Sequence, residues 1–348
     1  MNPGPGRRLA PVVRLAPAKL NLSLAVVGLR ADGFHDLHSV MTPLALADVL
    51  TLSAAPAGPD TLHVEGHDPG PAMDNLVLRA LAETRRAVGA GWGGSDGPGA
   101  RAAGPMAGPA PALATRLQKR IPVAAGLAGG SSDAAAAMDG ALEAWDAELD
   151  DHVRLELAAR LGSDVPFFLD GGMALVEGRG ERVTALRGIA GEAPGVLLVT
   201  PPLGASTADV FAAFAAGVRS VDPAATRATS IHLVTELAAG LTGARLLDWA
   251  GILASANDLV AAAGAVVPGL IPFRRALIRT LGRPVGQSGS GPTMWALYAS
   301  HAEAVEAAGL VRSAVADGRC PVPGDGPPSI EATSMVTTRQ THPQTEDS

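Results

Sequence analysis

A glycine-rich segment between a predicted strand and a predicted helix constrains this chain more than any other feature. Residues 122–133 read Pro-Val-Ala-Ala-Gly-Leu-Ala-Gly-Gly-Ser-Ser-Asp, after a strand expected at 115–120 and before a helix expected from Ser131. Glycines followed by hydroxyl side chains at a helix start present backbone N–H groups and the positive end of the helix dipole to a phosphate. The segment matches neither a Walker A loop nor the dinucleotide fingerprint. It therefore predicts another kind of phosphate site, or a capping turn with Ser131 as N-cap.

The first half of the chain predicts strands followed by helices. Strands are expected at 20–27, 38–46, 49–54 and 61–64, with a turn at 30–33 that makes the first of them a β-hairpin. Asp74 is expected to cap a helix that continues to Val88. Residues 89–112 are mostly Gly, Ala and Pro without a hydrophobic period, so we interpret them as a flexible surface insertion.

The second half predicts a mixture of both elements and ends in a loose tail from Cys320, interrupted by one short strand. Helices are expected at 153–161, 207–216, 231–237, 249–260, 272–281 and 302–315. Strands are expected at 173–177, 182–186, 196–200, 293–299 and 330–336. The pattern indicates an α+β protein.

Charge and cysteine content exclude several classes of function. Lys and Arg number 27 against 34 Asp and Glu, a net charge of −7, so we expect neither a nucleic-acid nor a membrane partner. The longest uncharged apolar stretch, 259–273, is shorter than a membrane helix and contains two prolines. One cysteine, Cys320, permits no intrachain disulfide and suits a cytoplasmic location.

Lysine is rare in this chain. Two of the 27 basic residues are lysines, Lys19 and Lys119, and the other 25 are arginines. Under such a bias, a lysine that persists is a candidate for a role that needs a compact ammonium. Chance survival is the alternative.

Three further motifs are candidates for chemistry. Asp164, in Leu-Gly-Ser-Asp-Val-Pro, follows a predicted helix end and is either a general base near the core or the cap of a turn. Lys19 stands at the mouth of a strand, where a surface lysine is the alternative. Residues 288–293, Ser-Gly-Ser-Gly-Pro-Thr, form either a tight turn or a second anion-binding nest.

Histidine spacing suggests a competing metal site. His63 and His67 stand four residues apart, and His35 and His38 three apart, spacings that would place each pair on one face of a helix. Both pairs lie in sequence typical of strands and turns, and no third ligand has suitable spacing.

Taken together and in order, five of these motifs resemble those of the GHMP small-molecule kinases. They are 17–22 (Pro-Ala-Lys-Leu-Asn-Leu), 30–35 (Arg-Ala-Asp-Gly-Phe-His), 122–132, 161–166 and 288–292, and the resemblance runs from Leu15 to Ala299. It implies a two-domain α+β fold, with an N-terminal domain like domain 2 of ribosomal protein S5 over 12–186. A ferredoxin-like C-terminal domain would span 187–319, and a short strand with a loose tail would follow over 320–348.

The resemblance also implies ATP and Mg²⁺ as cofactors. The ATP phosphates would be wrapped by Pro122, Val123, Ala124, Ala125, Gly126, Leu127, Ala128, Gly129, Gly130, Ser131 and Ser132. Ser132 would sit near the magnesium. Asp164 would take the proton of the substrate hydroxyl, and Lys19 would pair with it and steady the developing charge.

For the acceptor, the resemblance implies a small alcohol that carries a cytidine diphosphate group. Phe34 and His35 would hold the cytosine by stacking and base-edge hydrogen bonds, Asn21 would face the alcohol, and Phe211 would close the other face of the base. A kinase of the homoserine or mevalonate type, or a catalytically silent ligand-binding relative, is the alternative. A monomer and a homodimer are both open.

Two departures from the family pattern bear on the site. Ala124, Ala125 and Ala128 stand where the family's loop is often glycine, so either these positions do not need positive φ or ATP is held less tightly. Phe34 replaces a frequent tyrosine, which keeps stacking and loses a hydroxyl.

Overall fold

The computed structural model describes residues 10–55, 58–70, 75–89, 110–219 and 221–337. Asp74, residues 90–109 of the predicted insertion and residues 338–348 of the predicted tail lie outside them. The chain forms two compact units. Unit 1 comprises residues 1–17, 47–123 and 129–169, and unit 2 comprises 18–46, 124–128 and 170–348. The domain boundaries 12–186, 187–319 and 320–348 stay a prediction.

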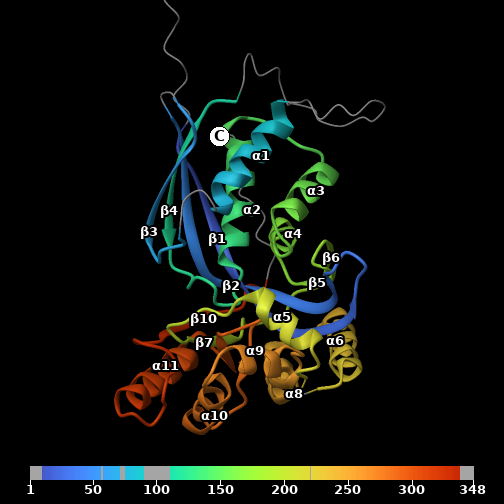
Figure 1. The fold of residues 1–348 in the computed structure, drawn as a ribbon, viewed down its shortest axis with the longest axis vertical. Coiled ribbons are helices and arrows are strands. Elements are labelled where there is room, and N and C mark those ends of the chain that lie inside the picture. The colour runs from blue at the N-terminus through green and yellow to red at the C-terminus, as the bar shows by residue number, and fades with distance from the viewer. Residues whose placement is uncertain (1–9, 56–57, 71–74, 90–109, 220, 338–348) are drawn as a thin grey trace, which may run out of the picture. The chain divides into compact units, whose positions relative to one another are not determined.

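Unit 1 packs helices against a small sheet. Its helices are α1 (Leu76–Gly89), α2 (Gly129–Ala144), α3 (Asp151–Leu161) and α4 (Val165–Leu169). Its strands are β3 (Thr61–Gly66), β4 (Leu113–Lys119) and the second half of β2 (His35–Ala54). β4 pairs parallel with β3 and antiparallel with β2. α1 and α2 lie side by side and bury Ala and Leu side chains against the sheet (Figure 1).

Unit 2 begins with a long hairpin. β1 (Val12–Leu29) pairs with β2, and the first half of β2 pairs with β5 (Ala174–Gly178), which pairs with β6 (Arg182–Ala185). A second sheet has the order β10-β7-β9-β8, formed by β7 (Gly195–Thr200), β8 (Gly286–Gln287), β9 (Met294–Tyr298) and β10 (Ser329–Ser334). The hairpin therefore carries Asn21, Phe34 and His35 of the residues predicted for the acceptor.

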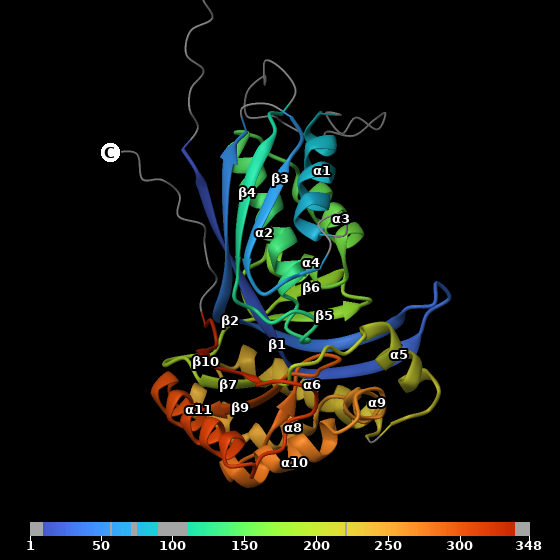
Figure 2. The same cartoon turned by 60° about the vertical axis from the view of Figure 1, so that its left-hand side comes forward.

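Helices cover the second sheet of unit 2. They are α5 (Thr207–Ala215), α6 (Pro223–Ala238), α7 (Gly243–Asp248), α8 (Ala250–Ser255), α9 (Val260–Val266), α10 (Leu270–Leu281) and α11 (His301–Ala316). α11 packs across β7, β9 and β10, and α10 packs beside α11 (Figure 2). Phe273 and Trp295 are among the largest fully buried side chains. Within the described ranges, no single helix has the length and hydropathy of a membrane span.

The α+β class is confirmed, and several predicted boundaries are wrong. The strands predicted at 38–46 and 49–54 are one strand, β2. α2 begins at Gly129, so Ser131 lies inside its first turn and is not its N-cap. The helix predicted at 249–260 breaks after Ser255 and resumes at Val260, and α7 was not predicted.

A buried ion cluster lies in the core of unit 1. β4 alternates between buried and more exposed residues, and its buried face ends in Lys119. The Lys119 ammonium donates to Asp48 and, at 2.7 Å, to Asp133, and all three side chains are almost fully buried. Asp48 Oδ1 also accepts the N–H groups of Arg120 (2.5 Å) and Ile121 (2.8 Å). The cluster therefore joins β2, the end of β4 and the first turns of α2.

We predict that Lys119→Met lowers the free energy of unfolding by about 3–5 kcal/mol, because it leaves two buried carboxyl groups without their cation. Arg120→Met is the matched control, since the Arg120 side chain is exposed on the neighbouring residue. Urea denaturation of both variants measures the difference. Equal losses in the two variants would contradict a structural role for the cluster.

Candidate active site

Hydrogen bonds hold four consecutive carbonyl groups of the glycine-rich segment inside unit 2. The oxygens of Ala124 and Ala125 accept the N–H groups of Ala205 (3.4 Å) and Thr293 (3.3 Å). Gly126 O accepts the Ser288 hydroxyl at 3.0 Å, and Leu127 O accepts the Lys19 N–H at 3.0 Å. All four carbonyls of residues 124–127 therefore point toward hydrogen-bond donors of unit 2.

The N–H groups of residues 124–128 differ from these carbonyls in their hydrogen bonding. In the described part of the chain, none of the N–H groups of residues 124–128 donates a hydrogen bond to another residue. Ala124 (φ 52°), Gly126 (φ 76°) and Ala128 (φ 54°) have positive φ, and residues of alternating φ sign make concave nests of N–H groups that bind anions. The segment is thus suited to a phosphate chain.

The alanines of this segment settle one of the sequence alternatives. Ala124 and Ala128 do adopt positive φ, so the interpretation that these two positions avoid it is wrong. Ala125 is not among the described residues with positive φ. A methyl group in the left-handed region costs about 1–2 kcal/mol per residue, so the segment stores strain at two positions.

Gly126 packs against the second glycine cluster. A Cβ atom at Gly126 would lie 2.3 Å from Ser288 O and 2.9 Å from Gly291 O. Residues 288–291 therefore form the surface on which the segment rests, and Gly126 has no room for a side chain.

The residues that continue the segment in unit 1 begin helix α2. Gly129 lies over the ion cluster, where a Cβ would be 2.9 Å from Lys119 Nζ. Ser131 is half-buried, and the Ser132 hydroxyl is buried with no hydrogen-bond partner among the described residues. Burial raises the pKa of Asp133 to about 7, with repulsion from Asp48 adding to the shift and attraction by Lys119 opposing it.

Asp164 lies in the turn between α3 and α4 of unit 1 and is half-buried. A Cβ at Gly162 in this turn would lie 3.8 Å from Ser131 Oγ. The structure therefore brings the turn that carries Asp164 beside the first turn of α2.

Lys19 is buried in β1, so the surface-lysine alternative is wrong. Its Nζ donates to Asn21 Oδ1 at 2.5 Å, and Asn21 Nδ2 donates to Ser39 Oγ at 2.8 Å. A Cβ at Gly289 would lie 3.0 Å from Lys19 Nζ. Lys19, Asn21 and the turn at 288–291 thus form one contiguous part of unit 2.

Phe34 and His35, which are predicted to bind the acceptor, lie at the hairpin of unit 2, and Phe211 lies on α5. Phe34 is 47% exposed, and the guanidinium of Arg179 lies 5.3 Å from its ring centroid. The His35 ring stacks on Phe211 at 5.1 Å with an interplanar angle of 28°. The structure brings His35 and Phe211 together and leaves Phe34 open to solvent.

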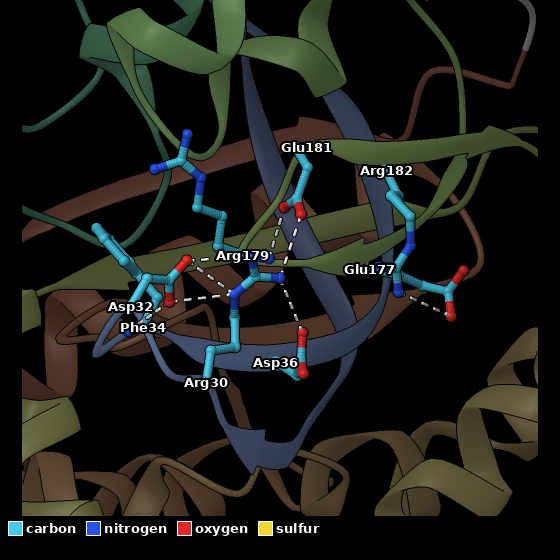
Figure 3. Close-up of polar contacts among 8 residues, drawn as sticks. All are labelled: Arg30, Asp32, Phe34, Asp36, Glu177, Arg179, Glu181 and Arg182. Carbon is cyan, nitrogen blue, oxygen red and sulfur yellow. Dashed lines mark hydrogen bonds and ion pairs between the residues drawn. The ribbon is translucent and has the colours of Figure 1, made fainter.

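Salt bridges order the turn that carries Phe34. Arg30 contacts Asp32 (3.0 Å), Asp36 (3.3 Å) and Glu181 (3.4 Å), as Figure 3 shows. Glu181 also accepts the Arg179 N–H at 2.7 Å, so the turn of β5 and β6 is tied to the hairpin. Sequence reasoning missed Arg179, because nothing local marks it as a neighbour of Phe34.

Burial, together with the positive charge of Arg219, holds the pKa of His35 below its ordinary 6.5. His35 is therefore neutral at physiological pH, with one ring nitrogen able to donate and the other able to accept. Such a ring can read the edge of a base.

The histidine metal site receives no support from the geometry. His63 lies on strand β3 and contacts Glu65 at 3.5 Å, whereas His67 lies beyond the end of the strand, after Gly66 at positive φ (96°). Among the described residues, no group of three or more His, Cys, Asp or Glu side chains is placed to hold a metal ion.

Comparisons with known proteins agree with the motifs. Residues 75–172 match the family model for the GHMP kinases N terminal domain. The 4-diphosphocytidyl-2-C-methyl-D-erythritol kinase of Pelotomaculum thermopropionicum is 38% identical over 301 residues, 86% of this chain and 94% of that protein. The Deinococcus radiodurans kinase of the same name is 36% identical over 319 residues, 90% of this chain and 91% of that protein.

The chain belongs to the 4-diphosphocytidyl-2-C-methyl-D-erythritol kinase family. A crystal structure named 4-(cytidine 5'-diphospho)-2C-methyl-D-erythritol kinase aligns with a TM-score of 0.62 and 30% identity, covering 92% of this chain and 99% of that one. A homoserine kinase from Cytophaga hutchinsonii aligns with the same TM-score at 15% identity, covering 98% of each chain, which shows a shared fold. The predicted GHMP kinase fold is confirmed, and this kinase family is favoured over the homoserine type.

We predict that Ala124→Gly and Ala128→Gly each leave the free energy of unfolding unchanged or raise it by up to about 1 kcal/mol, because relief of strain offsets the entropy of the unfolded chain. Ala125→Gly is the matched control and should lower it by about 0.5–1 kcal/mol. Urea denaturation measures all three. A loss at 124 or 128 equal to that at 125 would show that these positions carry no strain.

We predict that the His35 imidazole titrates below pH 6.5, so that the neutral ring persists as pH falls from neutrality. Its contribution to stability is present above 6.5 and is lost as pH falls through the pKa in the folded protein. NMR titration of the ring protons, assigned with His35→Asn, measures this pKa. Arg219→Gln should raise it, and a His35 pKa above 6.5 in the wild type would refute the assignment.

Proposed function

We propose that this protein transfers the γ-phosphoryl group of ATP to the 2-hydroxyl of 4-diphosphocytidyl-2-C-methyl-D-erythritol, giving the 2-phosphate and ADP. This reaction belongs to the non-mevalonate (methylerythritol phosphate) route to isoprenoid precursors. The family supports the choice of acceptor. The observation that carries the kinase chemistry is the segment 124–128. Unit 2 holds the carbonyls of 124–127, while none of the N–H groups of 124–128 donates to another of the described residues.

The chain segment 124–132 suits an ATP–magnesium complex. The N–H groups of 124–128 and the start of α2 supply donors for phosphate oxygens, and net charge of −7 makes such local donors necessary. The Ser132 hydroxyl is buried and has no hydrogen-bond partner in the described part of the chain, which suits the oxygen ligation that Mg²⁺ prefers. Mg²⁺, when bound, would neutralise charge on the transferring phosphate.

We assign the proton transfer to Asp164 and the charge stabilisation to Lys19. Asp164 accepts the proton of the acceptor hydroxyl as that oxygen attacks the γ-phosphorus, and the leaving group is ADP. Lys19, buried and fixed by Asn21, presents a positive charge that need not reorganise during the step. Phosphoryl transfer depends mainly on such positioning and electrostatics.

We assign recognition of the cytidine to the hairpin. The exposed Phe34 ring offers a stacking face, and neutral His35, stacked on Phe211, offers hydrogen bonds to the base edge. Stacking of a base on an aromatic ring contributes roughly 1–3 kcal/mol. Asn21, held between Lys19 and Ser39, is assigned to the alcohol end of the acceptor. We infer a cytoplasmic enzyme that is a monomer or a homodimer.

We predict that Asp164→Asn lowers kcat by roughly 10² to 10⁴ while the Kd for ATP changes little, because the variant keeps size and loses basicity. Lys19→Met should lower kcat by roughly 10² or more. Asp170→Asn is the control, since Asp170 is exposed just beyond α4. Collapse of ATP binding in Asp164→Asn would make this carboxylate a ligand or structural group.

The acceptor is tested by ADP release in a coupled assay with 4-diphosphocytidyl-2-C-methyl-D-erythritol, homoserine and mevalonate. We expect turnover of the first compound and little of the others. Rapid turnover of homoserine or mevalonate alone would falsify the acceptor assignment and leave the kinase chemistry standing.

A further inference from the structure

The break between α8 and α9 contains two buried polar side chains that the reaction does not use. Asn257 and Asp258 are 4% and 1% exposed, in a stretch otherwise rich in Ala and Leu. Their backbone joins β1, because Leu24 N donates to Ala256 O (2.7 Å) and Asp258 N donates to Leu24 O (3.0 Å). Burying such groups is unfavourable unless each is hydrogen-bonded, so their partners indicate their role.

The Asn257 amide forms hydrogen bonds to the turn on which the segment 124–128 rests. Its Nδ2 donates to Gln287 O at 3.0 Å and to Gly289 O at 2.9 Å, on the two sides of Ser288. Its Oδ1 accepts the N–H of Leu259 at 2.9 Å, at the start of α9. The amide nitrogen of Asn257 thus bonds the turn, and its amide oxygen bonds the start of α9.

The same turn, residues 287–291, also contacts Gly126. Ser288 Oγ donates to Gly126 O, and the backbone of Ser288 and Gly291 is the surface against which Gly126 packs. Gly289 itself is in the left-handed region (φ 56°), and a Cβ there would lie 3.0 Å from Lys19 Nζ. Asn257 therefore fixes two carbonyls of a turn whose displacement would move the phosphate-binding amides.

We propose that Asn257 is a positioning residue for ATP, acting through the turn 287–291 on the segment 124–128. The proposal rests on the proposed function, because it takes that segment as the ATP phosphate site. Asp258 has different partners, Val26 N (2.8 Å) on β1 and the Thr226 hydroxyl (2.5 Å) on α6. The dipeptide therefore contains its own control.

Asn257→Asp separates the two ends of the side chain. It keeps an oxygen for Leu259 N and replaces the donor with an oxygen that faces the carbonyls of Gln287 and Gly289. Calorimetry with ATP, and separately with the cytidine diphosphate acceptor, gives the two Kd values. We expect the Kd for ATP to rise tenfold or more and the Kd for the acceptor to stay within about twofold of wild type. The carboxylate repels the two carbonyls and displaces the turn, and the resulting loss for ATP is about that of one hydrogen bond to a charged group.

Asp258→Asn is the matched exchange on the next residue and should leave the Kd for ATP within about twofold of wild type. An unchanged ATP Kd in Asn257→Asp, or equal losses for both ligands or in both variants, would overturn the proposal in favour of a purely structural role.

Ser288→Ala keeps the proposal testable if Asn257→Asp does not fold. It removes the hydroxyl that bonds Gly126 O and should also weaken ATP selectively, and an unchanged ATP Kd in this variant would overturn the proposed route. Where both variants fold, the double variant should bind ATP no more weakly than Asn257→Asp, because the two changes act on one path. A wild-type protein that bound ATP without phosphorylating any acceptor would refute the proposed function alone, whereas one that bound no ATP would refute both.

Discussion

The hydrogen bonds to four consecutive carbonyls of residues 124–127 are the constraint on which the site depends. In a trans peptide the C=O and N–H groups point in opposite directions, so fixing the oxygens also fixes the amides. Each bond contributes about 0.5–1.5 kcal/mol, which is comparable with the cost of a non-glycine residue at positive φ. This balance explains how Ala124 and Ala128 hold conformations that glycine would adopt freely.

Both lysines of the chain are buried, which explains physically why lysine persists at these two positions. Lys19 donates to Asn21, and Lys119 donates to Asp48 and Asp133. An ammonium is a compact charge, whereas a guanidinium is a wide planar fork that would need more room and more acceptors. Gly129, where a Cβ would already lie 2.9 Å from Lys119 Nζ, leaves no such room. Arginine is tolerated elsewhere because most of these positions are at least partly exposed.

The sequence was sufficient for what depends on neighbouring residues. The hairpin, the helix after the glycine-rich segment and the strand at 293–299 follow from local periodicity and turn chemistry, and the motifs identified the family. The interruption at Asn257 could not be found in this way, because its partners lie at Leu24, Gln287 and Gly289. Pairing of Arg179 with Phe34, and of His35 with Phe211, likewise depends on contacts between distant segments.

The positions where local rules fail in unit 2 are joined by contacts. Ala124 and Ala128 have positive φ, and Gly126 between them packs on the turn 288–291. That turn lies against the buried Lys19. Asn257, at the break between two helices, donates to the same turn. Each feature is unfavourable alone, and such departures are expected at functional sites, where the surrounding structure compensates for them. Asn257 holds the turn through the carbonyls of Gln287 and Gly289, so it restrains the segment through contacts within the protein. Under the proposed function, the helix break that periodicity could not predict is the cost of holding the phosphate-binding segment in place.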